Sequence, residues 1–182
     1  MHILHTSSIF SFAQRHLLSL MPFLTLSRLR NALLALLEMT FARTQCRSRP
    51  FVYRIDPCTA CNIRCPGCEA HTQKTTEKRL LSLQDFQTIV DKVKGYCIRA
   101  SLYDTGEPLM NKNIYKMISY ASANKISTSI STNLTLFKKE KHLHDLFCSG
   151  LTVLQPDVDG VSQATYSTYR VNGEVSVVKE AI

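Results

Sequence analysis

The chain has 182 residues, of which 45% are hydrophobic and 20% are charged. This composition is ordinary for a globular protein and excludes a disordered, collagenous or low-complexity chain. No apolar run of about 18 residues occurs, because Arg28 and Arg30 interrupt the most hydrophobic region, so the sequence predicts no transmembrane helix.

The net charge of +8 is concentrated near the N-terminus. The first 54 residues contain seven arginines and one acidic residue, Glu38, which gives this segment +6 and leaves +2 for the rest of the chain. A nucleic-acid-binding domain would carry its basic residues across the folded part of the chain, so we expect no nucleic acid as a partner. We expect residues 1–50 to form a basic extension of a nearly neutral domain, residues 51–182.

Apolar residues of the extension recur at helical spacing, which predicts an amphipathic helix over about residues 24–42. The stripe consists of Leu26, Leu29, Leu33, Leu36, Leu37 and Phe41. Such stripes usually pack on the main domain, which is the interpretation that we prefer. The alternatives are a basic helix in peripheral contact with a membrane surface and a signal peptide, although no A-x-A-type cleavage site follows the apolar stretch from Leu17 to Leu26.

From Phe51 onward, strand patterns alternate with helical patterns. We predict strands at Phe51–Ile55, Ile98–Tyr103, Ile126–Ser131 and Leu151–Val158. We predict helices in the segment that Ser82 caps, and at Ile114–Asn124, Leu136–Cys148, Gln163–Arg170 and Glu174–Ile182, with Gly150 ending the third of these. This order predicts an α/β protein with a parallel sheet or barrel and right-handed crossovers.

A distinctive polar segment follows each of the four predicted strands. In chain order these are a cysteine loop, Gly106-Glu107-Pro108, Ser131-Thr132-Asn133 and Asp157-Val158-Asp159-Gly160. Because parallel strands end at one edge of a sheet, these segments should lie together where α/β folds bind ligands.

Four of the seven cysteines lie within 11 residues, at Cys58, Cys61, Cys65 and Cys68. Clustered thiols without a convincing export signal favour a metal or cluster in a reducing compartment, so we expect a cytoplasmic protein. Structural zinc sites usually separate two cysteine pairs by a longer spacer than the three residues found here. The spacing of the last three cysteines favours an iron–sulfur cluster with one open iron; zinc and unliganded thiols are the alternatives, and Cys58 is interpreted as incidental.

These segments resemble the motifs of the radical S-adenosylmethionine (SAM) superfamily. The sequence from Cys61 to Cys68 resembles its cluster-binding loop, and the segments after strands two and three resemble its Gly-Gly-Glu-Pro and Ser/Thr-Thr-Asn-Gly motifs. The segment after strand four, followed by Tyr166 and Arg170, is similar to a stretch of members with a C-terminal SPASM domain. The resemblance covers about residues 51–182.

The resemblance implies a radical SAM enzyme in which Cys61, Cys65 and Cys68 hold a [4Fe–4S] cluster and SAM chelates the fourth iron. The reduced cluster would cleave SAM and release a 5′-deoxyadenosyl radical, which would abstract hydrogen from a substrate that the sequence does not identify. An electron donor such as flavodoxin or ferredoxin is the implied partner. The alternatives are an iron–sulfur electron-transfer module without SAM cleavage and a zinc-stabilised interaction domain.

Under this resemblance, seven residues at the strand ends are candidate SAM contacts: Gly106, Glu107, Ser131, Asn133, Asp157, Asp159 and Arg170. The backbone of the first two would meet the methionine amino group. The serine and the asparagine would bind the methionyl carboxylate or support the strand end, and the arginine would pair with that carboxylate. Either aspartate would suit the ribose hydroxyls. No catalytic residue is assigned.

The length of residues 51–182 accommodates roughly four βα units, because one unit takes about 30 residues. The family core resembles an open barrel of six such units. We therefore expect a partial (β/α)6 barrel with an N-terminal helical extension, truncated before strands five and six and before any SPASM domain.

Overall fold

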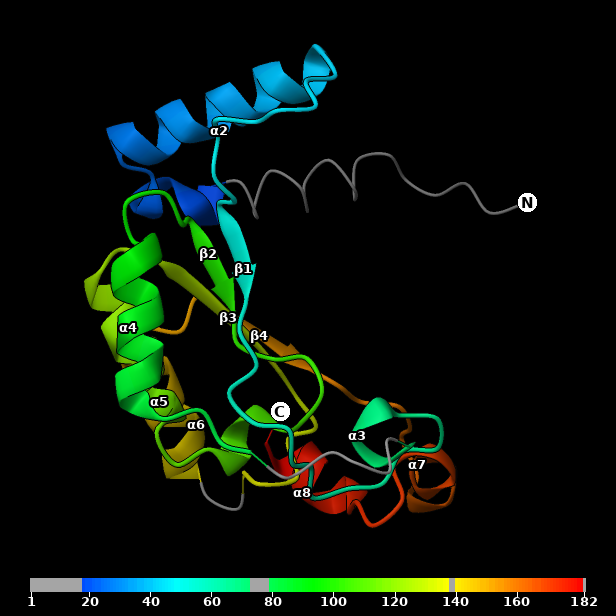
Figure 1. Ribbon diagram of the computed structural model, residues 1–182. Helices are drawn as coiled ribbons and strands as arrows, with labels where there is room; N and C mark the ends of the chain where they lie inside the picture. Colours follow the sequence, from blue (N-terminus) through cyan, green and yellow to red (C-terminus); the bar gives the residue numbers. More distant parts are fainter. Residues whose placement is uncertain (1–17, 73–78, 138–139, 182) are drawn as a thin grey trace.

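The computed structural model describes residues 18–72, 79–137 and 140–181, and this part of the chain contains a parallel four-stranded sheet (Figure 1). The strands lie in the order β1 (Val52–Arg54), β2 (Arg99–Ser101), β3 (Ser127–Thr132) and β4 (Val153–Pro156). All three neighbouring pairs are parallel. The predicted α/β fold with consecutive parallel strands is confirmed.

Of the six described helices that follow β1, the sequence predicts all but the first, and two of their ends have identifiable causes. They are α3 (Glu69–Thr72), α4 (Leu83–Val93), α5 (Ile114–Ala123), α6 (Glu140–Cys148), α7 (Gln163–Tyr169) and α8 (Val175–Glu180), with a short 3₁₀ turn η2 (Pro108–Met110). Ser82 caps α4 as predicted, because its Oγ accepts a hydrogen bond from the Asp85 N–H at 3.0 Å. Gly150 follows α6 with a φ of +89°, as expected of a C′ glycine.

The start of α6 differs from the predicted residue Leu136. Leu134 has a φ of +61°, and the Thr135 N–H donates to Asn133 Oδ1 at 3.0 Å. These contacts hold a turn after β3, so Leu136 and Phe137 are not helical, and the described part of the helix begins at Glu140. The predicted positions 138–139 lie outside the described residues.

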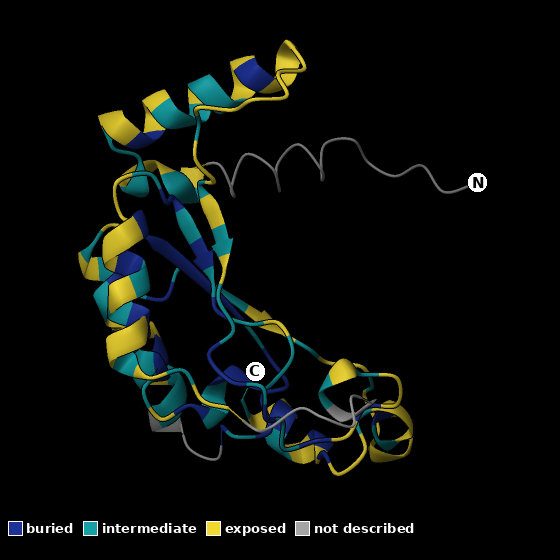
Figure 2. Cartoon of the chain, viewed as in Figure 1, coloured by how far each residue is buried: buried dark blue, intermediate teal, exposed yellow. Residues whose placement is uncertain are grey.

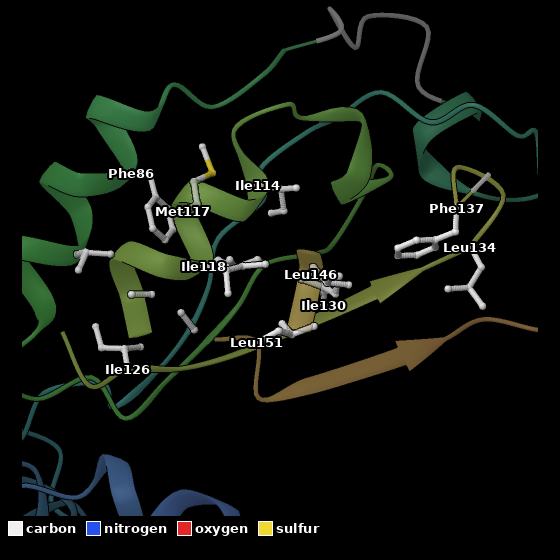
Figure 3. Packing of buried hydrophobic residues seen from close by; sticks show 14 of the residues in the cluster. Phe86, Ile114, Met117, Ile118, Ile126, Ile130, Leu134, Phe137, Leu146 and Leu151 are labelled. Atoms are coloured by element: carbon white, nitrogen blue, oxygen red, sulfur yellow. The ribbon is translucent and has the colours of Figure 1, made fainter. Parts of the chain in front are cut away.

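The hydrophobic core lies between the sheet and a layer formed by α4, α5 and α6 (Figures 1 and 3). Phe86 of α4, Met117 of α5 and Leu146 of α6 are fully buried in it. Alternation along β3 points Ile130 toward these helices and the neighbouring serines toward the opposite face. There the Ser129 hydroxyl donates to the Ser101 Oγ at 3.1 Å. The second face of the sheet is therefore polar along β2 and β3, and it leads to the carboxyl ends of these strands.

Helix α2 (Leu26–Thr40), preceded by the 3₁₀ turn η1 (Met21–Phe23), forms where the sequence predicts it but with the opposite orientation. The predicted stripe does not pack on the domain: Leu26 and Phe41 are 84% and 69% exposed, and the other four stripe residues are 43% to 54% exposed (Figure 2). Within the described residues, no helix is long and apolar enough to cross a membrane.

The physical reason for this orientation is Arg28, which is only 2% exposed. Its guanidinium donates to the carbonyl oxygens of Phe23, Lys94, Asn124 and Lys125. Hydrogen bonds from a charged donor are stronger than neutral ones, and a buried guanidinium needs them. They turn the polar side of α2 inward, which leaves the apolar stripe outside.

We predict that Arg28→Ala releases α2 while the sheet stays intact. Loss of these hydrogen bonds should lower the free energy of local opening by about 2 kcal/mol, which corresponds to roughly 30-fold faster amide exchange. Hydrogen–deuterium exchange should show the acceleration in α2 and unchanged protection in β3. Arg30→Ala, on the exposed side of the same helix, is the control; equal acceleration in both variants would contradict the role of Arg28.

Candidate functional site

The polar segments that follow the four strands meet in one pocket at the carboxyl edge of the sheet. The pocket is lined by Cys61, Ile63, Cys65, Cys68, Tyr103, Asp104, Thr105, Gly106, Glu107, Ser131, Asn133, Asp157 and Arg170. The three cysteines and six of the seven candidate SAM contacts are thus brought together. Asp159 is not among the lining residues, but its Oδ2 accepts a hydrogen bond from Arg170 Nε.

The cysteine loop after β1 has no regular secondary structure and is held by backbone hydrogen bonds from distant segments. Ala60 O accepts from the Glu107 N–H at 2.8 Å, and the Arg64 N–H donates to Val171 O at 2.8 Å. Near Cys68 the chain turns at Gly67, whose φ of +78° is unfavourable for residues with a side chain. This conformation explains why glycine stands before the third cysteine.

Gly106 allows the segment after β2 to lie directly against the cysteine loop. A Cβ atom at this position would lie 2.0 Å from Cys58 O and 2.6 Å from Ala60 O, both backbone atoms. The absence of a side chain is therefore required by the packing of the protein itself, which is a reason that the sequence does not reveal.

Glu107 joins the ends of β2 and β3 through its buried carboxylate, which is 2% exposed. Oε1 accepts from Thr132 Oγ1 at 2.7 Å and from the Leu109 N–H at 3.1 Å, and Oε2 accepts from the Asn133 N–H at 2.9 Å. Burial raises the pKa of this carboxyl, and these three donors oppose the rise. The side chain of Glu107 is thus engaged within the protein.

Asn133 continues this network into the cysteine loop. Its Nδ2 donates to Asn62 Oδ1 at 3.1 Å and lies 3.8 Å from Cys61 Sγ. Its Oδ1 accepts from Thr135 Oγ1 at 2.7 Å, and Thr135 in turn accepts from Asn62 Nδ2 at 2.7 Å. Asn133 was expected either to bind the methionyl carboxylate or to support the strand end. Its described contacts are all within the protein and correspond to the second role.

None of the three cysteines of the pocket forms a disulfide within the described part of the chain. In the part of the chain that the structure describes, no three His, Cys, Asp or Glu side chains form a ligand set for a single metal ion. A [4Fe–4S] cluster bonds each cysteine through a different iron, so its thiolates lie farther apart than the ligands of one ion. Cys61, Cys65 and Cys68 line one pocket, as three thiolate ligands of such a cluster must.

Cys58 differs from these three cysteines. It is 1% exposed, is not among the lining residues, and its Sγ accepts from the Ala60 N–H at 3.3 Å. Burial raises the pKa of its thiol. Its contacts are those of a buried structural residue.

Arg170 connects the cysteine loop to two carboxylates. Its Nη1 donates to Cys65 Sγ at 3.6 Å, and its Nη2 lies 3.9 Å from Asp157 Oδ2. Burial raises the pKa of the Cys65 thiol, and the Arg170 cation opposes that rise. Among the described residues that line the pocket, Arg170 is the one lysine or arginine.

Ser131 and Asp157 form the pocket wall beside Arg170. The Ser131 hydroxyl lies 2.9 Å from each oxygen of the Asp157 carboxylate. Burial raises the pKa of Asp157, while the Ser131 hydrogen bond and the Arg170 charge lower it. A partly buried carboxylate and a hydroxyl thus face the pocket together.

Sequence reasoning missed Tyr103, Asp104 and Thr105 as lining residues. Thr105 donates through its N–H, at 3.3 Å, and through its Oγ1 to Asp56 Oδ2, which joins the loops after β1 and β2. Their position at the end of the predicted second strand was the available signal, because that position places a residue at the carboxyl edge.

The chain matches one protein family and is similar in sequence to several enzymes. The pattern of the Radical SAM superfamily matches residues 55–182. A GTP 3′,8-cyclase of Desulforamulus reducens is 29% identical over 133 residues, which are 71% of this chain and 40% of the relative. An Fe-coproporphyrin III synthase of Methanosarcina barkeri is 28% identical over 105 residues, 57% of this chain and 26% of the relative. The chain thus spans less than half the length of these relatives.

Solved structures share the fold at low sequence identity. The structure of native anSMEcpe with bound AdoMet superimposes with a TM-score of 0.60 and 20% identity, over 72% of this chain and 39% of that chain. BtrN in complex with AdoMet and 2-DOIA gives a TM-score of 0.52 and 20% identity, over 64% of this chain and 54% of that chain. The described sheet and helices correspond to part of the barrel in these proteins.

We predict that Gly106→Ala disrupts the cysteine loop, because the new methyl group would collide with backbone that cannot rotate away. The reaction of thiols with a chromogenic disulfide should become markedly faster, since Cys58 and Cys65 lose their burial. The melting temperature should fall by about 5 °C or more, as a loss of roughly 2–3 kcal/mol implies. Gly95→Ala, where no atom lies within 4 Å of the added Cβ, should leave both measurements unchanged.

Proposed function

Because the chain belongs to the radical SAM superfamily, whose enzymes use a [4Fe–4S] cluster and SAM, we propose that its cysteine loop holds such a cluster and that the neighbouring strand ends bind SAM. The observation that carries the proposal is the lining of one pocket by Cys61, Cys65 and Cys68 together with Arg170 and Asp157. The relatives, among them GTP 3′,8-cyclases and a heme synthase, are enzymes.

When bound and reduced, the cluster would supply the electron that divides SAM into methionine and a 5′-deoxyadenosyl radical, which takes a hydrogen atom from a substrate. The chain's own residues orient the thiolates for this chemistry. Asn133 supports the loop next to Cys61, and the guanidinium of Arg170 stabilises a thiolate at Cys65. No residue is assigned to the hydrogen transfer.

The charges of the pocket give an orientation for SAM. The only anionic group of SAM is its carboxylate. Arg170 is the one cationic side chain that lines the pocket, so it is suited to bind that carboxylate. Asp157 suits the ribose hydroxyls better than Asp159, because Asp157 lines the pocket and Asp159 does not. The backbone around Gly106 and Glu107 remains our assignment for the methionine amino group, and Ser131 completes the wall next to Asp157.

The second candidate is a cluster-binding electron-transfer module without SAM cleavage. A simple electron carrier has no need of an arginine, a serine and an aspartate gathered in the same pocket as the thiolates, so the described lining favours the SAM-binding function. We also propose an electron donor such as a flavodoxin or ferredoxin, and a cytoplasmic location. Residues 51–182 would form the N-terminal portion of the catalytic core, with residues 1–50 as an extension. A SPASM association stays a prediction.

The cysteine assignment predicts a sharp difference between neighbouring thiols. After anaerobic reconstitution, Cys61→Ala, Cys65→Ala and Cys68→Ala should each lose most of the cluster's visible absorption and all release of 5′-deoxyadenosine. Cys58→Ala should keep both. Bound zinc in place of iron, or a cluster retained in all three pocket variants, would overturn the assignment.

The SAM assignment predicts a change in the electron paramagnetic resonance spectrum of the reduced protein when SAM is added. A cluster signal that does not respond to SAM, with no 5′-deoxyadenosine released, would favour the electron-transfer function instead. The measurement separates the two candidates because both contain the same reduced cluster.

Arg170→Gln should weaken SAM binding by at least about tenfold, because it removes the cation of the pocket, while most of the iron remains bound. Equilibrium dialysis with labelled SAM and iron analysis measure the two effects separately. Arg64→Gln, with an exposed side chain in the cysteine loop, is the matched control. Loss of iron in Arg170→Gln would assign the arginine to the support of Cys65 rather than to SAM.

A further inference from the structure

The proposed function does not explain why α2 turns its apolar residues outward. We define the apolar face of α2 as Leu26, Leu29, Leu33, Leu36, Leu37 and Phe41, all of them exposed. Leu18 and Met21, which precede the helix, are 58% and 59% exposed. A row of exposed apolar side chains of this kind is unusual on a protein surface and marks an interaction site.

The helix cannot bury this face by rotating, because its polar side is already bound. Besides Arg28, Asn31 donates through Nδ2 to Arg49 O at 2.8 Å and accepts at Oδ1 from the Arg49 N–H at 2.9 Å. Glu38 accepts from the Arg47 N–H at 2.6 Å and from Ser48 Oγ at 2.6 Å. A rotation would leave these buried or half-buried groups without partners.

The charges around the face select the kind of surface that it fits. Arg30 of α2 and Arg43, just after the helix, are exposed, whereas Arg47 and Arg49 lie on the polar side, where their backbone N–H groups donate to Glu38 and Asn31. Glu38 is the one acidic residue in the described segment 18–50. The hydroxyl of Ser48 and the N–H of Arg47 lower the pKa of Glu38, so its carboxylate is ionised but is already engaged by these donors. A second copy of the chain would bring arginines close to arginines, which repel each other. A surface with an apolar interior and anionic groups at its boundary would attract these arginines.

We propose that the apolar face of α2 docks on the surface of a membrane that contains anionic phospholipids, with the helix lying in the plane of the interface. Apolar side chains would enter the acyl boundary, and Arg30 and Arg43 would meet the headgroup phosphates; Arg30, next to the stripe, is long enough to reach them. The helix lies at the amino-terminal end of the strands, away from the pocket at their carboxyl ends (Figure 1). Docking therefore leaves the pocket accessible.

Co-sedimentation of the full 182-residue chain with lipid vesicles tests the proposal without cluster or SAM, so its result is independent of the proposed function. We expect binding to vesicles of phosphatidylcholine and phosphatidylglycerol to be at least about tenfold stronger than binding to phosphatidylcholine alone. Added salt should weaken the binding. Absence of sedimentation with either vesicle would overturn the proposal.

A pair of charge-matched variants tests whether the apolar face carries the binding. Leu33→Glu with Leu37→Glu should weaken vesicle binding by at least about tenfold, because two exposed apolar contacts are replaced by charges. Leu80→Glu with Val161→Glu adds the same charge at exposed sites elsewhere and should weaken it much less. Circular dichroism checks that both variants keep their helices. If both variants lost vesicle binding equally, the loss would be explained by the change in net charge and not by the apolar face, which would overturn the proposal.

Light scattering of the chain without lipid tests the competing occupant. The proposal expects a monomer at micromolar concentration. A dimer that Leu33→Glu with Leu37→Glu dissociates would show that the face joins two copies of the chain, which would also overturn the proposal.

Discussion

The site depends on one buried carboxylate. Glu107 receives three hydrogen bonds, two of them from the end of β3, so it fixes the positions of two strand ends relative to each other. A buried carboxylate is costly unless its oxygens are satisfied, which makes this arrangement nearly obligatory once the residue is buried. Asn133, held by that carboxylate, extends the network to Asn62 and to the sulfur of Cys61. The position of the cysteine loop thus depends on the contact of Glu107, in the segment after β2, with the end of β3.

The sheet has two chemically different faces, and this difference explains where the site lies. Ile130 and its neighbours in the cluster pack under α4, α5 and α6, whereas Ser101 and Ser129 bond to each other on the opposite face. Small hydroxyl side chains tolerate contact with water or with a polar ligand, which large aliphatic ones would not. Ser131 continues this row to the carboxyl edge, where its partner is Asp157.

Much of the fold was predictable because local signals and tertiary packing agree. The Ser82 cap, the Gly150 terminus and the β-branched third strand each depend on a few neighbouring residues. The strand-end pocket followed from the geometry of parallel sheets. The orientation of α2 was not predictable, since an apolar stripe does not reveal what its polar side contacts. Three of the four residues that accept hydrogen bonds from Arg28 lie 66, 96 and 97 residues away in the sequence. The need for glycine at position 106 was hidden for the same reason, because the colliding atoms belong to a loop formed by an earlier segment.

The position of Arg28 has a consequence for how the extension is coupled to the domain. Its acceptors Lys94 and Asn124 are the C-cap residues of α4 and α5, so the guanidinium lies at the ends of two helices whose aligned peptide dipoles leave partial negative charge there. A single cation thus compensates both macrodipoles. Fraying of the C-terminal end of α4 or α5 would remove carbonyl acceptors of Arg28 and would weaken the electrostatic attraction between Arg28 and the helix dipoles. The attachment of α2 is therefore a direct reporter of the integrity of the helical layer that covers the sheet.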